Sequence, residues 1–164
     1  RDLKLDFVTD ERYFQLLNRY FPRKTESILK RDIGELRALV EIIPWTSENL
    51  VSHAKKSSAA VIPIDLSVPM QRLKPENRLL IMWRLGLPCL TSPSPAYIRV
   101  AENAGVDAIC HSNEEWFEKL NQLLNDPGFA HRQVVNGQSY LSDNHNSKVL
   151  LNKWDLAMES VMNN

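Results

Sequence analysis

The sequence is poor in the residues that most often mark a metal, phosphate or hydrolytic site. Its 164 residues include two cysteines, four histidines and five glycines. Neither Cys89 nor Cys110 has a second cysteine or a histidine at ligand spacing, so we predict no metal site. The sequence also contains no Gly-x-Gly-x-x-Gly turn and no Gly-x-Ser-x-Gly elbow. These absences argue against a glycine-rich dinucleotide site and against a serine hydrolase.

An excess of charge of one sign and a long apolar run are missing as well. The 20 Lys plus Arg residues balance 20 Asp plus Glu residues, which argues against a nucleic-acid or membrane-surface binder. The longest apolar run, residues 79–83, is far shorter than the roughly 20 residues that span a bilayer. No apolar leader follows Arg1, and both thiols are isolated, so we expect a cytoplasmic protein. Residues 1–164 are expected to form one domain.

Short apolar runs alternate with amphipathic segments along the chain. Because parallel strands need a crossover helix, this alternation predicts an α/β fold. The expected fold is a Rossmann-like open parallel sheet of about five strands, flanked by helices and followed by C-terminal helices. The expected strands are 5–9, 40–43, 59–64, 88–91 and 107–110. The expected helices are 10–21, 25–36, 47–56, 75–85, 96–104, one that follows Ser112 and ends at 126–128, and two terminal helices, the last from about 147.

The carboxyl ends of parallel strands are where open α/β sheets bind ligands. This rule selects the polar and aromatic residues that follow the expected strands. They are Thr9, Asp10, Trp45, Thr46, Asp65, Thr91, Ser92, Ser94, His111, Ser112 and Asn113. Tyr97, in the helix expected after the fourth strand, is a further candidate.

Several of these residues have an ordinary structural interpretation beside the functional one. Trp45 could stack on a nucleobase or serve as a packing anchor. Thr46 most simply caps the next helix. Asp65 could orient a sugar hydroxyl or begin a turn, and Tyr97 could pack with its hydroxyl reaching the crevice. His111 could donate to a sugar or a phosphate, or be satisfied locally.

The helix start near Pro75 is the most informative position. Proline is favoured as the first helical residue, and the free N–H groups there form an anion site. Lys74 and Arg78 flank this start, where cations are unfavourable by about 0.3–1 kcal/mol each unless an anion compensates them. We therefore expect Lys74, Asn77 and Arg78 to hold a phosphate or diphosphate. The alternative is a surface helix start at which Glu76 partly neutralises both cations.

From about Val40 onward the sequence resembles the C-terminal, donor-binding domain of glycosyltransferases with the GT-B fold. The most telling pieces are the Lys-Pro-Glu-Asn-Arg run at 74–78 and the Gly-Leu-Pro turn at 86–88. The other pieces, in order, are 44–46, 57–64, 92–97, 115–124 and 126–127. Together these segments span about three quarters of the chain.

The resemblance implies a domain that binds a nucleotide-diphosphate sugar during glycan or polysaccharide assembly. Lys74, Asn77 and Arg78 would contact the donor diphosphate and sugar. Trp45 and Thr46 would lie near the base, and the segment 92–94 would line the cleft. The acceptor would bind a separate N-terminal domain outside this chain, so we expect no turnover by the chain alone. The nucleotide sugar is a substrate, and no further cofactor or metal is implied.

One departure from the family pattern keeps other interpretations open. Many retaining members carry two glutamates with seven residues between them, the second five residues before the turn glycine. Ile81 stands at that place before Gly86, so the pair is absent and the stereochemical outcome stays open. The main alternative is a non-catalytic Rossmann-like interaction module whose basic helix start binds an acidic partner. A sugar-nucleotide epimerase is a third candidate, although it needs acid–base carboxylates that the sequence does not display.

Overall fold

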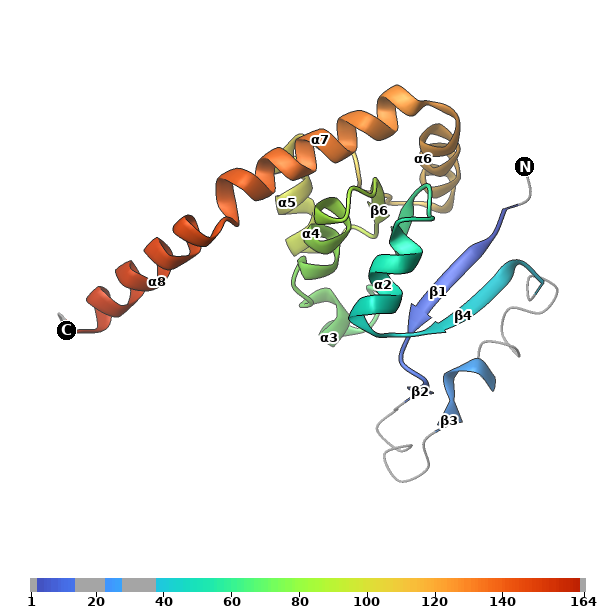
Figure 1. The fold of residues 1–164 in the computed structure, drawn as a ribbon, viewed down its shortest axis with the longest axis horizontal. Helices are drawn as coiled ribbons and strands as arrows, with labels where there is room; N and C mark the ends of the chain where they lie inside the picture. Colours follow the sequence, from blue (N-terminus) through green and yellow to red (C-terminus); the bar gives the residue numbers. More distant parts are fainter. Residues whose placement is uncertain (1–2, 14–22, 28–37, 163–164) are drawn as a thin grey trace. The chain divides into compact units, whose positions relative to one another are not determined.

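The computed structural model describes residues 3–13, 23–27 and 38–162 of the chain. These residues belong to two compact units, Arg1–Lys56 and Ser57–Asn164, whose elements are labelled in Figure 1. Each unit is described by itself below. The expectation that residues 1–164 form one domain stays a prediction.

The unit Arg1–Lys56 is built on a pair of parallel strands. Strand β1 (Leu5–Thr9) pairs with β4 (Val40–Pro44), in a register that runs from Leu5 opposite Val40 to Thr9 opposite Pro44. Helix α2 (Ser47–Ala54) follows β4, and its His53 Nδ1 lies 2.6 Å from Asp6 Oδ2 of β1. Both strands and the helix after Thr46 are therefore as the sequence predicted.

The segment between these strands differs from the prediction where it is described. We expected a helix over 10–21, but β2 (Arg12–Tyr13) pairs with β3 (Arg23–Lys24) in an antiparallel ladder. The rest of that expected helix, and most of the one expected over 25–36, lie outside the described residues. The strand pair is held by Thr25, whose N–H donates to the Glu11 carbonyl and whose hydroxyl donates to the Asp10 carbonyl.

The unit Ser57–Asn164 contains a two-stranded parallel sheet surrounded by helices. Strand β5 (Ala60–Ile62) pairs with β6 (Cys89–Thr91), and Thr91 adds a single bridge to Ile109. The helices are α3 (Pro69–Arg72), α4 (Asn77–Arg84), α5 (Pro95–Ala104), α6 (Asn113–Asn125), α7 (Pro127–Asn144) and α8 (Ser147–Met162). The prediction of a five-stranded Rossmann-like sheet is therefore wrong. The described residues are α/β but mostly helical, and their parallel pairing is limited to two separate two-stranded sheets and the single bridge at Thr91.

The missing strand at 107–110 has a local cause. Two ladder bonds do form, from Thr91 N–H to the Ala108 carbonyl and from Cys110 N–H to the Thr91 carbonyl. The Ala108 N–H, however, turns back to the Val106 carbonyl at 3.0 Å. Because the Ala108 N–H is used in this way, it does not pair with β6, and the pairing is limited to one bridge.

Helix packing supplies most of the core of this unit. Trp83 of α4 is fully buried and lies edge-on to Tyr140 of α7, with ring centroids 6.3 Å apart. Gly137 of α7 faces the same indole, and a Cβ placed there would lie 2.5 Å from two ring atoms. Glycine at 137 therefore allows α7 to approach α4 closely. Among the described residues, no helix is long and apolar enough to cross a bilayer.

Both cysteines are buried thiols in this core. Burial raises the pKa of Cys110 from its ordinary value of 9.0 to about 11, and burial raises the pKa of Cys89 still further. The folded state therefore favours the protonated thiols relative to the unfolded chain.

This difference predicts a loss of stability at high pH. Because the thiol pKa is raised in the folded state, the stabilisation is complete below about pH 9 and is lost as the pH rises towards about 11. Urea unfolding measured from pH 7 to 11 should show this fall, and it should be shallower in a Cys89→Ala/Cys110→Ala variant. If the stability of the variant fell with pH as steeply as that of the wild type, the thiols would not contribute to the pH dependence of stability.

Candidate functional site

The carboxyl-terminal edge of β5 and β6 is the place where the predicted site residues come together. The two loops that leave this edge are joined by hydrogen bonds. Ser92 N–H donates to the Ile62 carbonyl at 3.3 Å, and Ile64 N–H donates to Ser92 Oγ at 2.8 Å. Helix α5 begins directly after the second loop, and α4 precedes β6 in the chain.

Helix α4 begins later than the sequence suggested. Asn77 is its first residue and Glu76 its N-cap, so the placement of Pro75 as the first helical residue is wrong. The first N–H groups of an α-helix, here those of Asn77, Arg78 and Leu79, have no acceptor within the helix. The Glu76 side chain does not cap them. The anion site therefore stays a prediction, and Lys74 lies in the segment before the helix.

The carboxylate that could neutralise this cationic start is engaged elsewhere. Both Glu76 oxygens accept from Arg99 of α5, at 3.2 and 3.3 Å. Within the described part of the chain, neither Lys74 nor Arg78 forms an ion pair, and both are exposed. The contact also ties the start of α4 to α5. Sequence reasoning missed Arg99, because nothing local relates it to a residue 23 positions earlier.

Helix α5 also begins without a side-chain cap. Its N-cap, Ser94, is fully buried, and Ser94 Oγ has no hydrogen-bond partner among the described residues. Helix α3 also lacks a side-chain cap, whereas the side chains of Thr46, Ser112, Asp126 and Asn146 accept from the first turns of α2, α6, α7 and α8. The starts of α4 and α5 therefore both leave amide donors without a side-chain acceptor.

Two further predicted site residues, Tyr97 and Ser92, are buried at this edge of the β5–β6 pair. Tyr97 is almost completely buried, and Ser92 is buried with its hydroxyl already accepting from the backbone. Burial raises the pKa of Tyr97, whereas the positive charge of Arg78 lowers it.

The Asp65 side chain stabilises a turn that follows β5. Its Oδ1 accepts from Ser67 N–H at 3.0 Å and from the Ser67 hydroxyl at 2.6 Å. These hydrogen bonds lower the pKa of Asp65. The structural interpretation of Asp65 is thus favoured, although its exposed carboxylate lies in the loop that borders the site.

Trp45 and Thr46 belong to the unit Arg1–Lys56. Thr46 Oγ1 accepts from Asn49 N–H at 3.0 Å, so this residue caps α2 as expected. Trp45 is 57% exposed and follows β4. Their proposed place beside a nucleobase stays a prediction.

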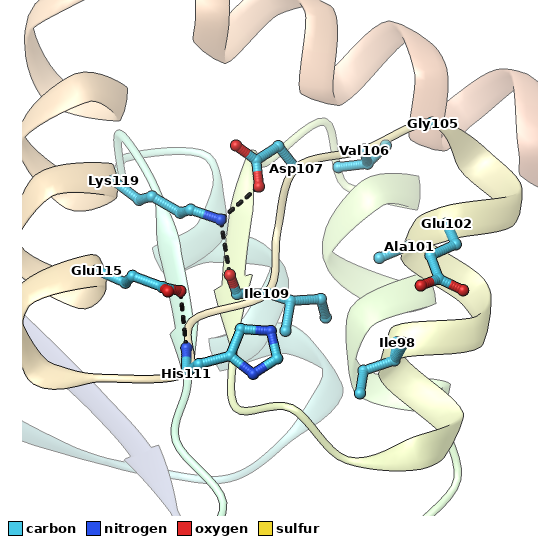
Figure 2. A pocket seen from close by; sticks show the side chains of 10 residues that line it. All are labelled: Ile98, Ala101, Glu102, Gly105, Val106, Asp107, Ile109, His111, Glu115 and Lys119. Atoms are coloured by element: carbon cyan, nitrogen blue, oxygen red, sulfur yellow. Dashed lines mark hydrogen bonds and ion pairs between the residues drawn. The ribbon is translucent and has the colours of Figure 1, made fainter.

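His111 lines a separate hollow between α5 and α6, with a volume of about 740 Å³. Figure 2 shows Lys119, Asp107 and Glu115 engaged with one another or with the backbone, whereas no interaction is drawn for Glu102 or for the His111 ring. Lys119 contacts Asp107 and the Ile109 carbonyl, and Glu115 accepts from His111 N–H. Three of the charged side chains that line the hollow are therefore already engaged, and we do not assign it a ligand.

The comparisons with known proteins give no further guide to function. No protein-family model matches the chain, and neither the curated proteins nor the solved structures that were searched contain a match. In the part of the chain that the structure describes, no three His, Cys, Asp or Glu side chains are grouped as metal ligands would be.

Proposed function

We propose that the unit Ser57–Asn164 binds the diphosphate of a nucleotide sugar, as the donor-binding part of a glycosyltransferase. One observation carries the proposal. The uncapped starts of α4 and α5 lie at the same edge of the β5–β6 pair, beside a cation whose acidic neighbour is bound to Arg99. Backbone amides at a helix start together with a guanidinium are the donors that bind phosphate best.

The proposed role of these residues depends on where negative charge develops during glycosyl transfer. When the glycosyl bond breaks, the diphosphate leaves with additional negative charge. Arg78 and the free amides of α4 would stabilise that charge, and Lys74 would approach from the preceding loop. The acceptor would come from outside this unit.

Thermal unfolding in the presence of nucleotides tests the proposal. UDP, GDP, ADP and dTDP are added separately at millimolar concentration, with the matching nucleosides as controls that lack the diphosphate. A ligand at a hundred times its dissociation constant stabilises by about 2.7 kcal/mol, and 1 kcal/mol shifts Tm by about 2–4 °C for a chain of this size. We expect a rise of roughly 5–10 °C with at least one diphosphate and none with its nucleoside. A folded chain whose Tm is unchanged by all four diphosphates would contradict the proposal.

A further inference from the structure

Helices α7 and α8 meet at a short joint, residues 145–146, where a histidine ring packs on the rest of the unit (Figure 1). The His145 ring lies against Tyr140 of α7, with ring centroids 5.6 Å apart and ring planes tilted by 49°. Tyr140 in turn lies edge-on to the buried Trp83 of α4. Helix α8 itself buries none of its residues. The contact between His145 and Tyr140 therefore connects the joint to the core.

The end of α7 gives a positive charge at His145 only limited support. A cation is favoured at a helix C-terminus because the last four carbonyl groups have no partner within the helix. Two of those four carbonyls already have donors. The His145 N–H donates to the Leu141 carbonyl at 2.9 Å, and the side-chain amide of Asn146 donates to the Ser142 carbonyl at 2.6 Å.

The surroundings of His145 favour the neutral ring. Burial is the largest effect, and it lowers the pKa of His145 from its ordinary value of 6.5. The positive charges of Lys153 in α8 and Arg84 in α4 lower this pKa further. The negative charge of Glu76, the N-cap of α4, acts in the opposite direction without reversing the shift. A proton on His145 is therefore held less well in the folded arrangement than in water.

We propose that His145 is a pH-sensitive hinge between α7 and α8. The neutral ring stays against Tyr140. When the ring gains a proton, it moves into water, and α8 turns at the joint so that Lys153 lies further from the new charge. Because α8 buries no residue, no packed side chain of this helix opposes the turn. A rotation of about 20° would displace Met158, roughly 17 Å along the helix from its start, by about 6 Å.

The direction of the pH dependence follows from the lowered pKa. The arrangement with the neutral ring is complete above pH 6.5 and is lost as the pH falls through the lower pKa that His145 has in this arrangement. This inference does not depend on the proposed nucleotide site.

The distance between two spin labels tests the proposal. The labels are attached at Ser139→Cys in α7 and Met158→Cys in α8, both exposed positions, while the native thiols are buried and stay unlabelled. The distance should shift by about 6 Å between pH 8 and pH 5, with a midpoint below 6.5. His145→Gln should abolish the shift. The matched control is His131→Gln, at an exposed position of α7, which should retain it.

Removing a neighbouring cation distinguishes a titrating hinge from a general effect of acid. Lys153→Gln should move the midpoint up towards 6.5, because one positive charge that opposes protonation of His145 is gone. Arg132→Gln removes a charge about 20 Å away along α7 and should leave the midpoint unchanged. The proposal is overturned if the distance is the same at pH 8 and pH 5, or if His145→Gln shows the wild-type shift. A midpoint above 6.5, or one that Lys153→Gln leaves in place, would overturn it as well.

Discussion

Reversing one charge, Arg78→Glu, is expected to remove nucleoside diphosphate binding while the protein stays folded. Arg78 is exposed in the first turn of α4, and Glu76 is paired with Arg99. A hydrogen bond to a charged group contributes about 1.5–3 kcal/mol, which corresponds to a roughly 10–150-fold change in affinity. A carboxylate at this position would also repel the diphosphate, so we expect a loss of at least about 100-fold by titration calorimetry.

The same helix provides a matched control for Arg78. Arg84 lies in the last turn of α4 and is exposed, so Arg84→Glu changes the net charge of the chain equally at the other end of the helix. This variant should bind nucleotide with wild-type affinity. If both variants bind alike, the diphosphate does not contact the start of α4. If even the wild type shows no affinity, the interaction-module hypothesis is favoured, in which the basic helix start binds an acidic protein segment.

The second large effect is expected from Gly137→Ala. Helix propensity alone predicts that alanine stabilises an exposed helical position by about 0.5–1 kcal/mol relative to glycine. At 137, however, the new Cβ would lie 2.5 Å from the Trp83 ring, whose neighbours hold it in the core. Overpacking of this kind costs about 1–3 kcal/mol. Chemical denaturation should therefore show a loss of stability.

Whether Gly137→Ala lowers or raises the stability distinguishes the effect of core packing from the effect of helix propensity. Ser139→Ala, at an exposed position of α7 two residues further along, should leave stability unchanged or raise it slightly. A Gly137→Ala variant that is as stable as the wild type would show that α7 can move away from Trp83 without cost. A Trp83→Leu substitution in the same chain should reduce the penalty of alanine at 137, because the smaller side chain leaves room for the methyl group.

Local signals in the sequence predicted individual elements well. The β-branched runs at 40–43 and 60–62 form strands, and Gly105 ends α5 in the left-handed conformation with a φ of 62°. Ser112 caps α6 through its hydroxyl, which accepts from the Glu115 N–H, and that helix was expected to follow Ser112. These features depend on residues close in the chain, so the pattern of neighbouring side chains was sufficient to identify them.

The features that the sequence did not predict depend on distant contacts. Alternating strands and helices predicted one parallel sheet, but alternation does not specify which strands pair, and β1–β4 and β5–β6 form separate sheets. The run at 107–110 has a strand-like composition, yet it meets β6 at a single bridge between Thr91 and Ile109. At the site, the cation cluster of α4 was recognised from its charges. The Glu76–Arg99 pair that leaves Arg78 unneutralised could be seen only in the folded chain.

Amide chemical shifts of the nitrogen-15-labelled chain, followed during titration with a nucleoside diphosphate, test the central claim most directly. The account predicts that the largest shifts occur at Asn77, Arg78 and Leu79 of α4 and at Ala96 and Tyr97 of α5, whose amides lie at the two uncapped helix starts. The matching nucleoside should leave these signals in place. Shifts confined to other residues, such as those around the hollow at His111, would contradict the assignment of the diphosphate site to this edge.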